Sequence, residues 1–172
     1  MSAQDEVAAP VACRVLLVGE CNPYGSDPEF ALYCHPPGCS GHRLRRILGL
    51  SEDQYLDLHR ANLCTGDWSK EQAKFRASEL LNPTSPWNVL VLCGRKVTET
   101  YEKLVFDGVP LVAFSSRVGS FGIRLISLPH PSGRNAALWN PLARARAREL
   151  LRVAVPEVPW GSADGHAEKV TA

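Results

Sequence analysis

The sequence of 172 residues has no apolar stretch that approaches the roughly 20 residues needed to cross a bilayer. No signal-peptide pattern opens it, so we expect a cytoplasmic protein without a membrane partner. An excess of either charge is also missing, because 19 Lys and Arg against 18 Asp and Glu give a formal net charge of +1 at pH 7. Total charge therefore does not indicate a nucleic-acid-binding protein, and any attraction for phosphate must come from local clusters.

The six cysteines lack the spacing of a disulfide framework. Cys13 and Cys93 fall in apolar runs, as reduced thiols of a core do. One alternative is a metal site, because Cys34 and Cys39 with His42 have a spacing that can reach one zinc. The C-x₄-C spacing is loose, so we favour two incidental thiols and expect neither a bound metal nor a cofactor.

The length and an ordinary hydrophobic fraction of 45% suit one domain with a sizeable core. Apolar runs of strand length alternate with helical patterns between residues 12 and 155. Residues 1–11 and 156–172 lack such periodicity, so we predict a disordered N-terminal tail and a flexible C-terminal tail.

Candidate strands lie at 14–19, 55–63, 88–93, 109–114 and 123–128, and candidate helices at 42–50, 69–81, 96–105 and 141–154. This alternation indicates βαβ units with a mainly parallel sheet. We therefore predict an α/β fold, a single-domain three-layer α/β/α sandwich with a central, mainly parallel four-stranded sheet. Ligands of such sheets bind outside the carboxyl ends of the strands. This rule places residues 20–41, 62–68, 94–95 and 130–135 on one rim.

The most informative segment on this rim reads Leu128-Pro-His-Pro-Ser-Gly-Arg-Asn135. Two prolines fix the backbone on either side of His130, which aims its ring. The alternative interpretation is a turn whose histidine caps a neighbouring group.

The same rim supplies polar groups that suit a base-binding pocket. Asn22 or Glu20, after the first strand, can position a water molecule. Asn62 offers a donor and an acceptor together, which suits the edge of a pyrimidine. A phosphate-cradling P-loop and a nucleophile elbow are both missing.

Arginines form two clusters along the chain. One comprises Arg43, Arg45 and Arg46, and the other comprises Arg134, Arg144, Arg146, Arg148 and Arg152. Such clusters supply the local positive potential that phosphate contacts require. The alternative is that they are solvated helix faces.

Four motifs in order resemble those of the uracil-DNA glycosylase superfamily. Gly19-Glu-Cys-Asn-Pro-Tyr24 is similar to its water-activating loop, and Asn62-Leu-Cys64 resembles the strand end that reads the base. Leu92-Cys-Gly-Arg-Lys-Val97 resembles a Gly-Arg turn that opens a helix. His130-Pro-Ser-Gly-Arg-Asn135 resembles the leaving-group and wedge loop of the single-strand-selective branch.

The resemblance implies a monofunctional DNA glycosylase, which flips a nucleotide from the stack and hydrolyses its N-glycosidic bond. His130 would donate to the departing base. Asn22 would position the attacking water, or Glu20 would do so, as in the iron–sulfur branch of the superfamily. Arg134 would fill the space left by the flipped base. The other DNA contacts would come from Ser132, Gly133, Asn135 and Arg95. We expect a monomer that acts on DNA.

Departures from the family pattern bear on the substrate. The family stacks a Phe on the base where this chain has Pro36-Pro37-Gly38, so Phe30 or Tyr33 would have to substitute. We place Tyr24, Tyr33 and Pro36 around the base. We expect this base to be a uracil-like or bulky 5-modified pyrimidine, for example the glucosylated hydroxymethylcytosine of phage DNA.

Two alternatives to this enzyme remain. One is a non-catalytic relative that binds modified DNA, which Asn22 favours because efficient uracil enzymes carry Asp at that place. The other is an N-glycosidase for free nucleosides, which the arginine clusters disfavour.

Overall fold

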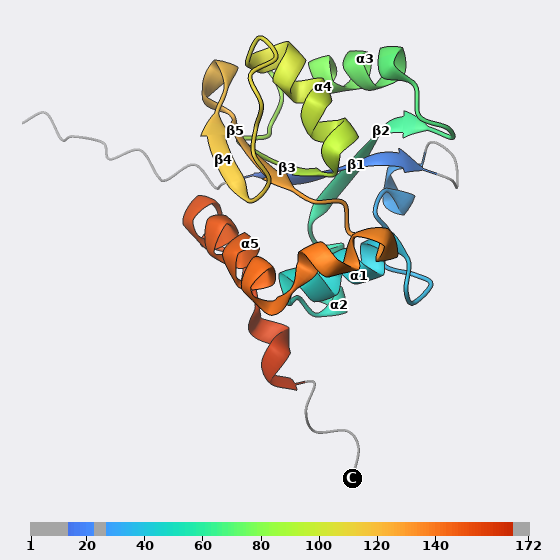
Figure 1. Cartoon of the computed structure of the whole chain (residues 1–172), viewed down its shortest axis with the longest axis vertical. Coiled ribbons are helices and arrows are strands. Elements are labelled where there is room, and N and C mark those ends of the chain that lie inside the picture. The colour runs from blue at the N-terminus through green and yellow to red at the C-terminus, as the bar shows by residue number, and fades with distance from the viewer. Residues whose placement is uncertain (1–13, 23–26, 167–172) are drawn as a thin grey trace, which may run out of the picture.

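The computed structural model describes residues 14–22 and 27–166 and has an α/β fold (Figure 1). Five strands form one sheet in the order β2-β1-β3-β5-β4. Their bounds are β1 (Val15–Asn22), β2 (His59–Thr65), β3 (Val89–Cys93), β4 (Ser115–Val118) and β5 (Arg124–Leu128). The helices are α1 (Ser40–Leu48), α2 (Glu52–Leu56), α3 (Lys70–Leu80), α4 (Arg95–Val105) and α5 (Pro141–Ala154). Short 3₁₀ segments are η1 (Pro28–Phe30), η2 (Ser120–Gly122), η3 (Gly133–Trp139) and η4 (Ser162–His166).

Helices cover both faces of the sheet, which confirms the predicted three layers. Helices α3 and α4 lie on one face, and α1, α2 and α5 lie on the other (Figure 1). Alternate side chains of β1 and β3 pack into the two layers, so Leu17 of β1 joins the core under α1 and α5 whereas Leu16 and Val18 join the core under α3 and α4. The central strand β3 is buried along its whole length, as a parallel strand covered on both faces must be.

The sheet has five strands instead of the predicted four. Strands β1, β2, β3 and β5 are parallel, and β4 joins the edge antiparallel to β5. The strand expected at 109–114 is wrong, because Val109 and Val112 are exposed there and Phe114 has a left-handed φ of 58°. The Phe114 N–H donates to the Ser127 carbonyl, and the ladder with β5 then runs over Ser115–Val118, a short run without an apolar pattern.

The strand expected at 55–63 begins later, at His59. Residues before it form the short helix α2, because Ser51 and Gln54 make a capping box in which each side chain binds the other residue's backbone N–H. Tyr55 is buried, and its hydroxyl donates to the Leu32 carbonyl at 2.7 Å. The start of α3 after Ser69 and the whole of α5 agree with the prediction.

The C-terminal segment is packed further than predicted. Trp160 is buried in the core under α1 and α5, and its indole N–H donates to the Val155 carbonyl at 2.9 Å. Backbone N–H groups of Gly161 and Ala163 donate to Leu48 and Gly49. Trp160, Gly161 and Ala163, which belong to the tail predicted from 156, therefore contact the domain, while residues 1–11 and 167–172 lie outside the described ones. None of the helices in the described ranges is long and apolar enough to span a bilayer.

Candidate functional site

A cavity of about 290 Å³ lies where the carboxyl halves of β1 and β2 meet the loop after β5. It is lined by Glu20 of β1, Asn62 of β2 and His130, together with Phe30 and Tyr33 from the connection to α1. The chain leaves β1 toward β2 on one side and later continues from β3 on the other side. The cavity therefore lies at the kind of switch point where open α/β sheets bind ligands, as predicted.

The loop that carries His130 is held by hydrogen bonds of its own. The Ser132 backbone N–H donates to His130 Nδ1 at 3.1 Å. The Asn135 side-chain amide and the Trp139 indole N–H both donate to the His130 carbonyl, at 3.1 and 3.4 Å. Because Nδ1 accepts this hydrogen bond, Nε2 must carry the proton of a neutral ring. His130 is thus a fixed neutral donor that faces a cavity.

Burial lowers the pKa of His130 below 6.5, and Lys96 lowers it as well, whereas Glu20 raises it. Removing a charged ring from water disfavours imidazolium. The neutral form that the Ser132 contact requires is therefore also the form that burial favours near pH 7.

Asn62 faces a glycine on the neighbouring strand. Gly19 and Asn62 are paired in the register of β1 and β2, and a Cβ on Gly19 would lie only 2.2 Å from Asn62 Oδ1. The buried Oδ1 has no hydrogen-bond partner among the described residues. A buried acceptor without a partner costs free energy unless a ligand satisfies it, so Asn62 is well placed to accept from a bound N–H group.

Glu20 and His130 approach each other beside Gly94, at the start of α4. A Cβ on Gly94 would lie 2.9 Å from Glu20 Oε1 and 3.1 Å from His130 Cδ2, and its φ of 116° also favours glycine. Lys96 places its ammonium 3.7 Å from the Glu20 carboxylate. Lys96 was not among the site residues predicted from the sequence, although its position two residues after the rim residue Gly94 places it close to the same rim.

Two aromatic rings, those of Phe30 and Tyr33, line the cavity. Phe30 and Tyr33 meet edge to face with ring centroids 5.7 Å apart. His35 also lines the cavity, and its ring centroid lies 5.5 Å from that of Tyr33. Pro36 is exposed and is not part of the lining, so its predicted place beside the base is not reproduced.

Two residues of the predicted site cannot be placed against the cavity. Asn22 ends β1, paired with Thr65, but its side chain lies outside the described part of the structure. Tyr24 lies outside the described residues altogether.

The expected DNA contacts divide into two groups. Gly133 and Arg134 are exposed at the start of η3, and Ser132 and Asn135 are partly buried beside them. Arg95 belongs to a different set of contacts. Its guanidinium binds Glu99 at 2.8 Å and the buried Glu102 at 3.0 Å, which ties it to α4.

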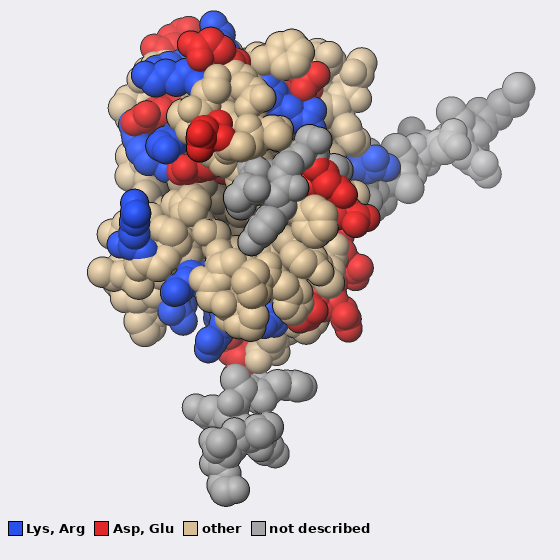
Figure 2. Space-filling view, turned by 90° about the vertical axis from the view of Figure 1, so that its right-hand side faces the viewer, with Lys and Arg blue, Asp and Glu red and all other residues tan. Residues whose placement is uncertain are grey.

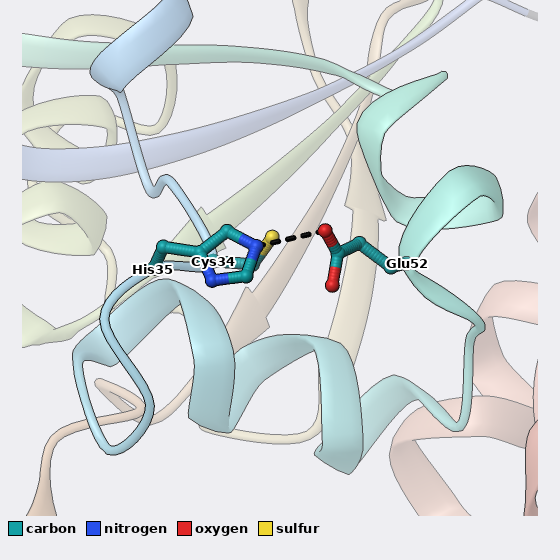
Figure 3. Close-up of side chains that lie close together, drawn as sticks. All are labelled: Cys34, His35 and Glu52. Atoms are coloured by element: carbon teal, nitrogen blue, oxygen red, sulfur yellow. Dashed lines mark hydrogen bonds and ion pairs between the residues drawn. The ribbon is translucent and has the colours of Figure 1, made fainter.

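Cysteine and histidine also meet near the cavity, but not as the Cys34, Cys39 and His42 trio of the alternative zinc site. Cys39 Sγ donates to the Tyr33 carbonyl and caps α1, and His42 Nδ1 accepts from the Gly38 N–H. Figure 3 shows Cys34, His35 and Glu52 together, with ligand atoms within 4.8 Å of one another.

This trio has the atoms to hold a metal ion, but its present contacts satisfy it without one. His35 Nε2 and Glu52 Oε1 form a hydrogen bond of 2.8 Å. Cys34 packs in the apolar core, where burial raises the pKa of its thiol. The described contacts are thus those of a hydrogen-bonded pair, His35 and Glu52, beside a core thiol.

No known family model matches this chain, and no curated protein is similar to it in sequence.

Proposed function

We propose that this protein is a monofunctional DNA glycosylase that removes a pyrimidine from DNA and leaves an abasic site. The observation that carries the proposal is that His130, Asn62 and Glu20 line one cavity. They are a neutral histidine donor, an amide whose buried oxygen has no hydrogen-bond partner among the described residues, and a carboxylate. A glycosylase needs these three groups together, to hold the leaving base, to read its edge and to position water.

His130 would act on the departing base. As the C–N bond breaks, the base takes the electron pair and the sugar develops positive charge. A fixed N–H aimed at the developing anion stabilises the transition state, and removal of such a donor costs about 10²–10³ in rate. Nε2–H of His130 would donate to the pyrimidine O2.

Glu20 would position the attacking water. The water oxygen bonds to the sugar carbon, and its proton passes to the carboxylate and then to solvent. Glu20 lines the cavity beside His130, and a carboxylate is a better acceptor for this proton than an amide such as Asn22. This supports Glu20 as the water-positioning residue.

Base recognition would come from the remaining lining. Asn62 Oδ1 accepts from an N–H at the base edge, and this suits both N3–H of a uracil and the amine of a cytosine. Phe30 and Tyr33 supply aromatic surface, so the lining does contain rings on which a base can stack. Bases of both uracil and bulkier 5-modified type fit this chemistry.

Defined oligonucleotides test the proposal. Single-stranded and duplex DNAs with one uracil, 5-hydroxymethyluracil or glucosylated 5-hydroxymethylcytosine are incubated with the full chain. Abasic sites are scored by alkaline cleavage and released bases by mass. We expect release of at least one of these bases. His130→Ala should lower the rate about 10²–10³-fold, while His59→Ala, at the start of β2 outside the cavity, should not.

Two results would change the proposal. Activity on uracil alone would exclude the bulky-base form. Tight binding to a modified DNA without base release would contradict a glycosylase and favour a non-catalytic reader of modified DNA.

A further inference from the structure

A second cavity, of about 310 Å³, lies next to the first and is lined by basic side chains. They come from α1 and from the start of α5: His42, Arg43, Arg46 and Arg144. Ser132, of the His130 loop, completes the polar part of its wall. No Asp or Glu is among the described residues that line it.

Among the described residues, no Asp or Glu forms an ion pair with the arginines of this basic cavity. Arg43 Nε donates to the Gly38 carbonyl and Arg144 Nε donates to the Trp139 carbonyl, both at 2.9 Å. These contacts fix the two guanidinium groups through one nitrogen each. Within residues 14–22 and 27–166, no ion pair is formed by Arg43, Arg46 or Arg144. Like charges gathered without a counter-charge repel one another, and a bound anion relieves this repulsion.

The surface around the two cavities is divided by charge. In the lower half of the face in Figure 2, Lys and Arg side chains gather on the left and Asp and Glu side chains on the right. Helices α1 and α5 lie in this half of the molecule (Figure 1). A phosphate-bearing strand would therefore meet a positive region on one side of the site only.

Neighbouring residues of the same two chain segments line the two cavities. Cys39, Ser40 and Gly41 line the first cavity, while Gly38, His42 and Arg43 line the basic one. On the other side, His130 lines the first cavity, Ser132 lines the basic one, and the Ser132 N–H binds His130 Nδ1. An anion in the basic cavity would thus lie next to the loop that orients the histidine.

We propose that the basic cavity binds a backbone phosphate of the DNA strand whose base enters the first cavity. This inference rests on the proposed function for the identity of the strand. Arg43, Arg46 and Arg144 supply the guanidinium groups, which suit phosphate oxygens. Neither arginine cluster suffices alone, because the cavity takes Arg43 and Arg46 from one and Arg144 from the other.

Binding of an unmodified 12-nucleotide single strand by the full chain, measured by fluorescence anisotropy at several salt concentrations, tests the site. Arg43→Gln, Arg46→Gln and Arg144→Gln should each weaken binding roughly tenfold. Each should also reduce the salt slope by about 0.7, the value for one single-strand phosphate. Arg146→Gln is the matched control, because Arg146 lies on the same helix, also donates Nε to a backbone carbonyl and does not line the cavity.

An equal loss in Arg146→Gln would overturn the inference, since the effect would then be that of total charge. Unchanged oligonucleotide affinity in the three variants, together with loss of inorganic phosphate binding, would also overturn the inference. That result would indicate a site for a free anion. Failure of the proposed function is distinguishable, because base release is measured separately. A chain that binds the strand through these arginines but releases no base keeps the phosphate site and loses the glycosylase.

Discussion

The backbone N–H of Ser132 donates to Nδ1 of His130 at 3.1 Å, so one short loop joins the first cavity, which His130 lines, to the basic cavity beside it. The contact fixes which ring nitrogen carries the proton and holds the ring against its own backbone. A DNA strand bound near Ser132 would therefore be held at a fixed position relative to the His130 donor. This relationship makes the orientation of His130 testable without reference to any substrate.

Ser132→Pro should free the histidine ring while leaving the loop in place. Ser132 has φ of −66°, which proline also adopts, so the substitution removes the N–H without forcing the backbone. We expect ¹⁵N NMR to show Nε2–H as the tautomer of wild-type His130 and a mixture in the variant. Ser132→Ala, which keeps the N–H, should retain the wild-type tautomer. A single Nε2–H tautomer in Ser132→Pro would show that another contact orients the ring.

Acid should destabilise the protein partly through His130. Its pKa in the folded state lies below 6.5 because of burial, so the unfolded chain binds more protons and stability falls as pH drops through 6.5. The slope for one such group is at most about 1.4 kcal/mol per pH unit. Urea unfolding of His130→Gln between pH 7.5 and 5 should give a shallower loss than wild type. Parallel curves for the two proteins would contradict the assignment.

Gly19→Ala should disturb Asn62 specifically. A Cβ there would lie 2.2 Å from Asn62 Oδ1, too close for either group to stay in place. Gly19 has no left-handed φ, so the cost comes from crowding and not from the backbone. Most of this crowding falls on Asn62, and the rest on Leu32, whose Cγ and Cδ2 would lie 3.0 Å from the new Cβ. We expect a loss of about 1–3 kcal/mol in the free energy of unfolding and a larger proportional loss of base release than of strand binding. Equal losses of both would mean that Asn62 does not read the base.

The sequence reveals the layers of this fold better than its edge. Continuous apolar runs predict buried strands such as 89–93, and the cap at Ser69 predicts the start of a helix. Strand β4 could not be found this way, because Ser115–Val118 is a short polar edge that depends on pairing with β5. Local propensity does not report such tertiary pairing.

The site divides in the same manner. The rim rule correctly grouped Glu20, Asn62 and His130, because it depends only on where strands end. It could not foresee that Arg43 and Arg144, about a hundred positions apart, share a cavity, since that depends on how α1 and α5 pack. Nor could it show that Arg95 is tied to Glu102, which lies two helical turns further along α4.

Arg95→Gln should act on stability before it acts on DNA binding. Glu102 is buried, with a side chain only 5% exposed, and its Oε1 also accepts the Leu111 N–H at 2.6 Å. Loss of the guanidinium leaves this carboxylate with one weaker partner. Because Arg95 is itself largely exposed, we expect about 1–3 kcal/mol lower stability in urea. Glu99→Gln, at the surface end of the same network, should change stability by less than about 1 kcal/mol. Unchanged stability of Arg95→Gln with weaker DNA binding would instead give Arg95 the DNA role.

Trp160→Ala should show that the segment after α5 belongs to the folded domain. The indole is 4% exposed and closes the core under α1 and α5, and its N–H satisfies the Val155 carbonyl. Truncation leaves a cavity and removes the 2.9 Å donor of the Val155 carbonyl, which keeps only the longer 3.4 Å bond from the Val158 N–H among the described residues. We therefore expect a loss of about 3–5 kcal/mol in urea unfolding. Val153→Ala is the control, because this side chain on α5 is 74% exposed and should change stability little. If Trp160→Ala unfolds at the same urea concentration as Val153→Ala, the segment is a dispensable tail after all.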